Sequence, residues 1–182
     1  MKNIFESREF SQYQVSSLYE SKSTVIESYQ FSKGCSTVFL SHKHADLDDL
    51  KDIVGFLEKE YPVKVYIDSR DTSMPQITCG KTAENIKNRI RQCKKFILLA
   101  TNGAIDSKWC NWELGFGDAQ KFQDHIALFP IKPKDAYDSS YRGTEHMSIY
   151  PYIPFMMELR NTQTEIQLKE DIMYAQKKTT DL

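Results

Sequence analysis

Short apolar runs alternate with amphipathic stretches through the middle of the chain. Four runs have the length and composition of buried strands, and they cover residues 37–40, 63–67, 95–101 and 126–131. Between them, apolar residues recur at spacings of three and four, which predicts amphipathic helices after Asp46, over 83–93 and over 109–119. The order β-α-β-α-β-α-β predicts a parallel sheet that is covered by helices on both faces.

Individual residues sharpen the ends and faces of these helices. Asp46 is expected to cap the first helix, and the pair Tyr61 and Pro62 ends it. The pair Asn102 and Gly103 predicts a turn after the third strand. The third helix has one predicted stripe, which consists of Trp109, Trp112, Phe116 and Ala119.

The two ends of the chain lack this alternation and set the predicted domain boundaries. Residues 1–34 are rich in Ser, Tyr and Gln and predict a mobile or loosely docked N-terminal extension, with a short helix around Val15–Tyr29. Residues 149–153 predict a short edge strand, and Thr162 with Glu165 predicts a capped C-terminal helix over 163–176. The predicted division is therefore an extension (1–34), one domain (35–160), and a C-terminal helix and tail (161–182).

Composition narrows the classes of function. The 182 residues include 24 Lys and Arg against 25 Asp and Glu, so no basic excess favours nucleic acid or an anionic membrane as a partner. No apolar run approaches the roughly 18 residues of a membrane span, and no secretory signal begins the chain. The four cysteines lie far apart, which predicts reduced thiols in a cytoplasmic protein and disfavours a structural metal site.

In open α/β sheets, ligands bind beyond the carboxyl ends of the strands. That rule selects residues 41–46, 68–80 and 101–113 as the places to look for chemistry. Three motifs in these segments are weak. The sequence Gly80-Lys81-Thr82 has Pro75 where a phosphate-binding loop needs its earlier glycine. The histidines at 42 and 44 have no third metal ligand nearby, and the cysteine at 110 has no histidine paired with it by sequence.

Trp109 and Glu113 form the most informative pair in the sequence. They are four residues apart, so they share one face of a helix close to its first turn. That turn borders the expected ligand site, where a carboxylate is available for chemistry. The alternative is structural: Trp109 belongs to the core, and Glu113 favours the helix N-terminus through the helix dipole.

Several segments together resemble the TIR (Toll/interleukin-1 receptor homology) family. The sequence Val38-Phe39-Leu40-Ser41-His42 with Asp46 resembles its first-strand box, and Val65-Tyr66-Ile67-Asp68 followed by 70–80 resembles its second strand and loop. Residues 96–101 resemble its third strand, and Trp109-x-x-x-Glu113 matches the tryptophan–glutamate motif of its enzymatic members. The resemblance covers about residues 35–160. It implies a flavodoxin-like α/β fold, with a parallel sheet of about five strands and helices on both faces.

The resemblance also implies a function. Bacterial TIR enzymes cleave NAD at the nicotinamide–ribose bond, with NAD as substrate and without a cofactor, and the implied catalytic residue is Glu113. Trp109 is then expected to stack on a base or on the ribose. The residues expected to face the nucleotide or to border the site are Ser41, His42, Lys43, Asp68 and Arg70.

The same family implies partners and a setting. TIR proteins self-associate, and bacterial members often act in antiphage defence, as in Thoeris systems, where an ADP-ribose-derived signal reaches a second protein. Two other readings stay open. One is a non-enzymatic TIR adaptor that only recruits other TIR domains. The other is an unrelated flavodoxin-like module, such as a receiver or a nucleoside deoxyribosyltransferase, although the third strand ends Ala100-Thr101-Asn102 without a receiver's aspartate.

Overall fold

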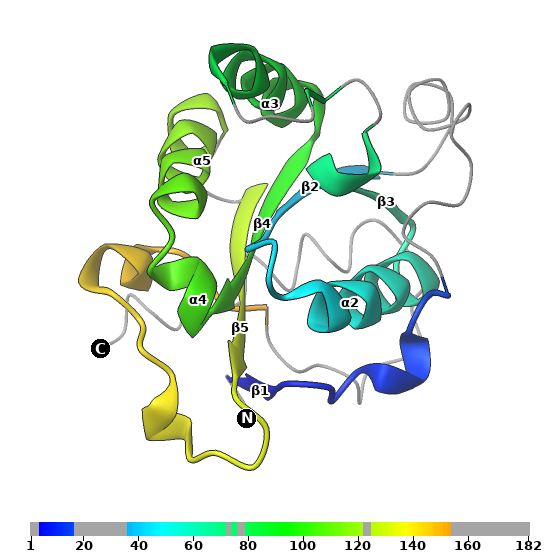
Figure 1. The fold of residues 1–182 in the computed structure, drawn as a ribbon, viewed down its shortest axis with the longest axis vertical. Coiled ribbons are helices and arrows are strands. Elements are labelled where there is room, and N and C mark those ends of the chain that lie inside the picture. Colours follow the sequence, from blue (N-terminus) through cyan, green and yellow to red (C-terminus); the bar gives the residue numbers. More distant parts are fainter. Residues whose placement is uncertain (1–3, 17–35, 72–73, 76–78, 122–124, 154–182) are drawn as a thin grey trace.

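The computed structural model describes residues 4–16, 36–71, 74–75, 79–121 and 125–153. A parallel five-stranded sheet runs through these residues in the order β1-β5-β4-β2-β3 (Figure 1). The strands are β1 (Phe5–Glu6), β2 (Ser36–Ser41), β3 (Val63–Tyr66), β4 (Lys95–Thr101) and β5 (Ile126–Lys132). The α/β fold with a flavodoxin-like sheet is therefore confirmed, with the fifth place taken by β1.

Helices cover both faces of the sheet, as the alternation predicts. The helix α2 (Leu47–Glu60) lies on one face, and α3 (Gly80–Gln92) and α5 (Lys108–Gln120) lie on the other (Figure 1). Each face has its own apolar core. β2, β4 and β5 contribute alternate side chains to the two cores, because successive residues of a strand point to opposite faces.

The N-terminal segment belongs to the first of these cores. β1 pairs with the outer side of β5, and the chain after it runs along α2 (Figure 1). The side chains of Phe5, Phe10 and Tyr13 are buried in the core on that face of the sheet, where Phe10 and Tyr13 contact Phe56 of α2. The predicted mobile or loosely docked extension is wrong for residues 4–16, because their aromatic side chains fill the place beside Phe129 of β5. Most of the helix predicted around Val15–Tyr29 lies outside the described residues.

The predictions for residues 102–103 and 149–153 are wrong. Asn102–Ile105 form the short helix α4 and not a turn, since the Thr101 hydroxyl accepts a hydrogen bond from the Ala104 backbone and caps a helical turn. Residues 149–153 do not form an edge strand. Tyr152 makes one isolated bridge to Leu128, and the chain before it is the 3₁₀ helix η5 (Glu145–Ile149). The helix predicted over 163–176 lies outside the described residues.

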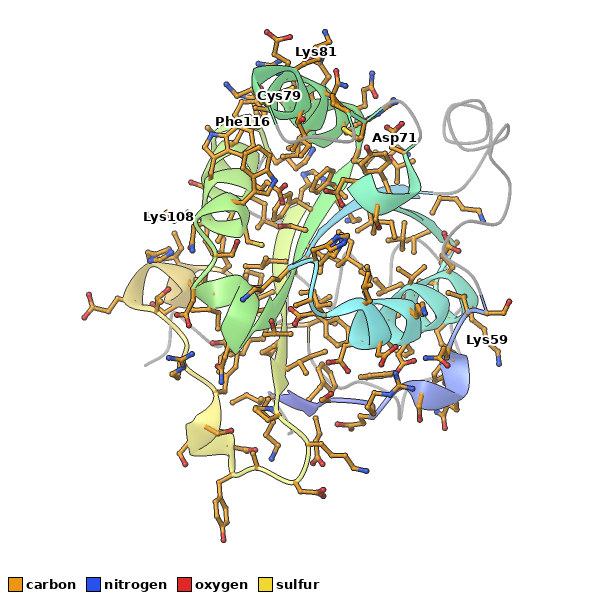
Figure 2. All side chains as sticks on the ribbon, in the orientation of Figure 1. Lys59, Asp71, Cys79, Lys81, Lys108 and Phe116 are labelled. Carbon is orange, nitrogen blue, oxygen red and sulfur yellow. The ribbon has the colours of Figure 1, made fainter. Side chains whose placement is uncertain are left out.

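The buried face of α5 is rotated from the predicted stripe. Cys110, Glu113, Leu114 and Gly117 face the sheet, whereas Ala119 is exposed. Phe116 is only half-buried on the side of α5 that faces α3 (Figure 2), where Lys87 and Arg91 lie over its ring. A Cβ on Gly117 would lie 3.1 Å from the Phe96 ring, so this glycine lets α5 approach the sheet closely. The rotation carries a carboxylate into the interior.

Candidate active site

Polar side chains lie where three of the strands end. Ser41 closes β2 and Thr101 closes β4, while Asp68 begins the short helix η2 (Asp68–Arg70) after β3. Glu113 reaches this place from the second turn of α5, across the sheet edge that the strand-end rule selects. The three segments that the rule named therefore do meet through specific side chains.

Glu113 is the centre of the cluster. Its side chain is buried, with 3% exposed, and the Ser41 hydroxyl donates a hydrogen bond of 2.5 Å to Glu113 Oε2. The Trp109 side chain, one turn earlier on α5, acts on the same carboxyl group and lowers its pKa. An indole N–H only donates, so both neighbours offer protons to Glu113.

Burial controls the charge of this carboxyl group. Removal from water is the largest cause of a pKa raised to about 8 for Glu113, and the negative charge of Asp68 acts in the same direction. The hydrogen bonds from Ser41 and Trp109 act in the opposite direction, because they favour the ionised form. A buried carboxylate held by donors and poised near neutral pH is typical of catalytic sites.

Cys110 adds a thiol that the sequence analysis had set aside. It is buried, and Ser41 acts on its thiol by lowering the thiol's pKa. Burial is the largest cause that raises the pKa of the Cys110 thiol, and Glu113 raises this pKa too. Cys110 is therefore a neutral group and not an activated nucleophile.

His42 and Asp68 connect the ends of β2 and β3. His42 Nε2 lies 3.7 Å from Asp68 Oδ1, and His42 Nδ1 lies 3.3 Å from the Leu40 carbonyl oxygen. The His42 side chain is 4% exposed, whereas Asp68 is 39% exposed. Of these two predicted site residues, Asp68 is the one that presents its charge to solvent beside Glu113.

The pair Asp46 and Thr101 was missed by the sequence analysis. Helix α2 does begin after Asp46, but this carboxylate accepts a 2.5 Å hydrogen bond from the Thr101 hydroxyl and caps no backbone N–H. The pair fixes the loop after β2 against the end of β4. Exposed Lys43 extends from this loop across Gly103, where an added Cβ would lie 2.9 Å from Lys43 Cδ. The pair could have been expected, because Asp46 follows the end of β2 and Thr101 ends β4, and these two parallel strands are neighbours in the sheet.

Trp109 is half-buried and lies against a second indole. The ring centroids of Trp109 and Trp112 are 5.0 Å apart, and Lys87 of α3 lies over Trp112 at 5.7 Å. The Trp109 side chain thus contacts Glu113 on one side and Trp112 on the other. Its predicted stacking on a base or ribose stays a prediction.

An ion pair between buried Asp71 and half-buried Arg89 anchors the chain that leaves η2. Asp71 Oδ2 accepts hydrogen bonds from the Tyr66 hydroxyl at 2.8 Å and from Arg89 Nε at 2.9 Å (Figure 2 labels Asp71). This triad ties the end of β3 to α3. Arg70 is the last residue of η2, and its side chain lies outside what the structure describes.

The weak motifs have structural explanations. Lys81 pairs with Glu84 on the exposed side of α3, and Thr82 caps the helix together with Cys79 (Figure 2), so Gly80-Lys81-Thr82 is a helix start. Within the described residues, no three His, Cys, Asp or Glu side chains gather as metal ligands. Cys79, Cys93 and Cys110 are free thiols. In the same part of the chain, no helix has the length and apolarity that a bilayer crossing requires.

A parallel, doubly wound sheet with a buried glutamate at its strand ends defines an α/β domain with a carboxylate-centred site. Residues 38–169 match the TIR domain family, and the chain belongs to that family. It is 30% identical over 131 residues to a Bacillus cereus (strain MSX-D12) protein named "Probable 3' cyclic ADP-D-ribose synthase ThsB'". The match covers 71% of this chain and 66% of that relative's length.

A solved prokaryotic SEFIR domain is also similar in structure. The similarity covers 79% of this chain and 92% of that chain, at 11% sequence identity and a TM-score of 0.48.

Proposed function

We propose that this protein cleaves NAD at the nicotinamide–ribose bond, with Glu113 as the catalytic residue. The observation that carries the proposal is the buried Glu113 carboxyl group, which is held by Ser41 and Trp109 at the strand ends of a TIR domain. The name of the Bacillus cereus relative, a probable cyclic ADP-ribose synthase, supports the same substrate class.

Cleavage of the nicotinamide–ribose bond is accelerated by one negative charge at the position of Glu113. When the C–N bond breaks, its electron pair goes to the nicotinamide nitrogen, which leaves neutral, and positive charge develops on the ribose. A carboxylate about 4 Å from that charge, at an effective dielectric constant near 20, is worth roughly 4 kcal/mol. That energy corresponds to about a thousandfold in rate. Nicotinamide is already a good leaving group, so the reaction needs no general acid.

The second carboxylate supports the same reaction. Asp68 is close enough to raise the pKa of Glu113, and it is more exposed than Glu113. Its negative charge favours a cationic substrate at this edge of the sheet. Once the ribose cation forms, a nucleophile bonds to the ribose carbon and loses a proton. Water gives linear ADP-ribose, and a nucleophile from the same nucleotide gives a cyclic product.

Assembly is part of the proposal. Glu113 is only 3% exposed in the single chain, so NAD reaches it after a rearrangement of the neighbouring loops. Self-association of TIR domains is a means of populating such an arrangement. We propose that the product is an ADP-ribose-derived signal, made in the cytoplasm in antiphage defence and sensed by a second protein.

The test is nicotinamide release by purified protein concentrated on beads, with products resolved by mass. Above about pH 8, where the Glu113 carboxyl group is ionised, Glu113→Gln is expected to lose about a thousandfold in rate while the protein still folds. The matched control is Glu84→Gln, the same change on the exposed side of α3, which leaves the rate unchanged. No release by the wild-type protein at high bead density would favour the adaptor. Equal rates for the two variants would remove Glu113 from the mechanism.

A further inference from the structure

The hydroxyl of Ser41 is held by the sheet within hydrogen-bonding distance of the Glu113 carboxyl group. Ser41 is the last residue of β2, and it pairs with Leu98 of β4, so its backbone belongs to the sheet. The side chain is 1% exposed and donates to Glu113 Oε2 at 2.5 Å. A donor that is fixed to a strand holds its acceptor more rigidly than a donor on a loop.

We propose that Ser41 is a positioning residue for Glu113: its buried hydroxyl holds one carboxylate oxygen in place and favours the ionised carboxylate. The inference rests on the proposed NAD cleavage. It assigns Ser41 a different task from the one that the family resemblance implies. A hydroxyl has one proton, and here that proton is used on Glu113 and not on the nucleotide.

Cys110 adds no charge beside Ser41 and Glu113. Burial is the largest cause that raises the pKa of the Cys110 thiol, whereas Ser41 lowers it. The raised pKa keeps the thiol neutral, so the Ser41 hydroxyl has the Glu113 carboxyl group as its charged partner.

The hydrogen bond acts against the other charges around Glu113. Asp68 of η2 raises the pKa of Glu113, and His42, at the end of β2, faces Asp68 and not Glu113. Cys110 on α5 is neutral, and Asp46 before α2 acts on the Cys110 thiol. Ser41 and Trp109 are the two groups that lower the pKa of Glu113. Without Ser41, the carboxyl group keeps its proton to a higher pH.

The experiment compares Ser41→Ala with Ser36→Ala, the same change at the other end of β2. Ser36 is also buried, but its hydroxyl has no hydrogen-bond partner among the described residues. The side-chain carboxyl carbon of Glu113 is followed by NMR in glutamate-labelled protein across the pH range, with its signal assigned from its loss in Glu113→Gln. Nicotinamide release by the same samples gives kcat and KM at each pH.

Ser41→Ala is expected to move the Glu113 titration upward by about one pH unit, and the rising limb of the rate profile moves with it. We expect kcat to fall about ten- to a hundredfold, since a hydrogen bond to a charged group is lost, while KM for NAD stays within about threefold. Ser36→Ala leaves the titration and the rates as in the wild-type protein.

Two results would overturn the proposal. One is a Glu113 titration that is the same in Ser41→Ala and in the wild-type protein. The other is a rise in KM with kcat and the pH limb unchanged, because Ser41 then contacts the nucleotide itself. If the wild-type protein releases no nicotinamide, the proposed function fails. The NMR titration still decides the role of Ser41, because it does not depend on turnover.

Discussion

Asp52 and Glu113 are both buried carboxylic acids, but their surroundings differ in charge. Asp52 lies on α2, 1% exposed, and faces Arg8 Nε of the N-terminal segment at 3.5 Å. Glu113 lies on α5, 3% exposed, and faces a hydroxyl, an indole and the negative charge of Asp68. Burial raises the pKa of both groups, whereas an approaching cation counters this effect at Asp52.

The difference separates an acid that fastens the chain from the acid that we propose is catalytic. The Arg8 backbone N–H also donates to Asp49, so the acidic side of α2 holds the N-terminal segment at several points. At Glu113 the fold tolerates an acid whose ionisation costs stability. Proteins tolerate such costs mainly at functional sites.

The largest expected effect concerns the N-terminal side of this comparison. Phe10 is 3% exposed, and its ring lies 4.6 Å from Phe56 and 5.5 Å from Phe129. Phe10→Ala is expected to lower the free energy of unfolding by about 3–5 kcal/mol, measured by urea denaturation. The control Tyr137→Ala, at a residue that is 88% exposed, changes it by less than about 0.5 kcal/mol. Equal effects would mean that residues 4–16 are an appendage.

The sequence alone predicted the architecture but not its first strand. Four strands and three helices follow from period and length, because each has enough apolar residues to display a pattern. β1 has only two residues, Phe5 and Glu6, and no period can be recognised in two. Its position depends on Phe10 and Tyr13 packing under α2, which is tertiary information.

The residues of the candidate site were predicted from the sequence, but the contacts between them were not. The strand-end rule and the Trp109-x-x-x-Glu113 motif selected residues that do lie together. The rotation of α5 was not predicted, because Trp109 and Trp112 look like core residues while Cys110 and Glu113 take the buried face. Hydrogen bonds between distant segments, such as Asp46 with Thr101, depend on side-chain geometry that spacing does not contain.

The next prediction concerns the dependence of stability on pH that buried Glu113 causes. The folded-state pKa of about 8 lies above the unfolded value of about 4.3, so between them only the folded chain holds this proton. Stability therefore falls as the pH rises through that window, by about 1.4 kcal/mol per pH unit. Glu113→Gln does not ionise, so its stability relative to the wild-type protein should rise steadily from pH 5 to pH 7.

Urea denaturation at several pH values measures this difference, and Glu84→Gln is the exposed control that should track the wild-type protein. A constant difference between Glu113→Gln and the wild-type protein would show that Glu113 ionises as easily when folded as when unfolded. The contrast with Asp52 would then disappear.

A smaller effect tests how closely the N-terminal segment lies on α2. A Cβ on Gly55 would lie 1.8 Å from the Tyr13 carbonyl oxygen, which is backbone and cannot rotate away. Gly55→Ala is expected to cost about 2 kcal/mol. Gly115→Ala is the same change in α5, where nothing lies within 4 Å, and it is expected to gain up to about 1 kcal/mol. Thermal unfolding of both variants gives the comparison, and a gain at both positions would contradict the close approach.

The smallest expected change in stability comes from breaking the Arg8–Asp52 ion pair. Arg8→Met removes the cation and keeps a long side chain. The backbone φ of 69° at position 8 strains arginine and methionine alike, so it does not affect the comparison. Because the Arg8 side chain is 35% exposed, we expect a loss of only about 1 kcal/mol at pH 7. Without Arg8 the raised pKa of Asp52 rises further, so ionised Asp52 costs more stability at neutral pH. The loss should shrink as the pH falls and Asp52 takes up a proton.

Two further variants identify Asp52 as the cause. Asp52→Asn in the Arg8→Met background should recover most of the loss at pH 7, because the amide carries no charge to be buried. Arg142→Met breaks the surface pair with Asp106, whose side chains are 63% and 58% exposed, and should cost nothing measurable. A loss for Arg8→Met that persists at low pH, or that Asp52→Asn leaves in place, would assign the role of Arg8 to packing. In that case the cation would not be what distinguishes Asp52 from Glu113.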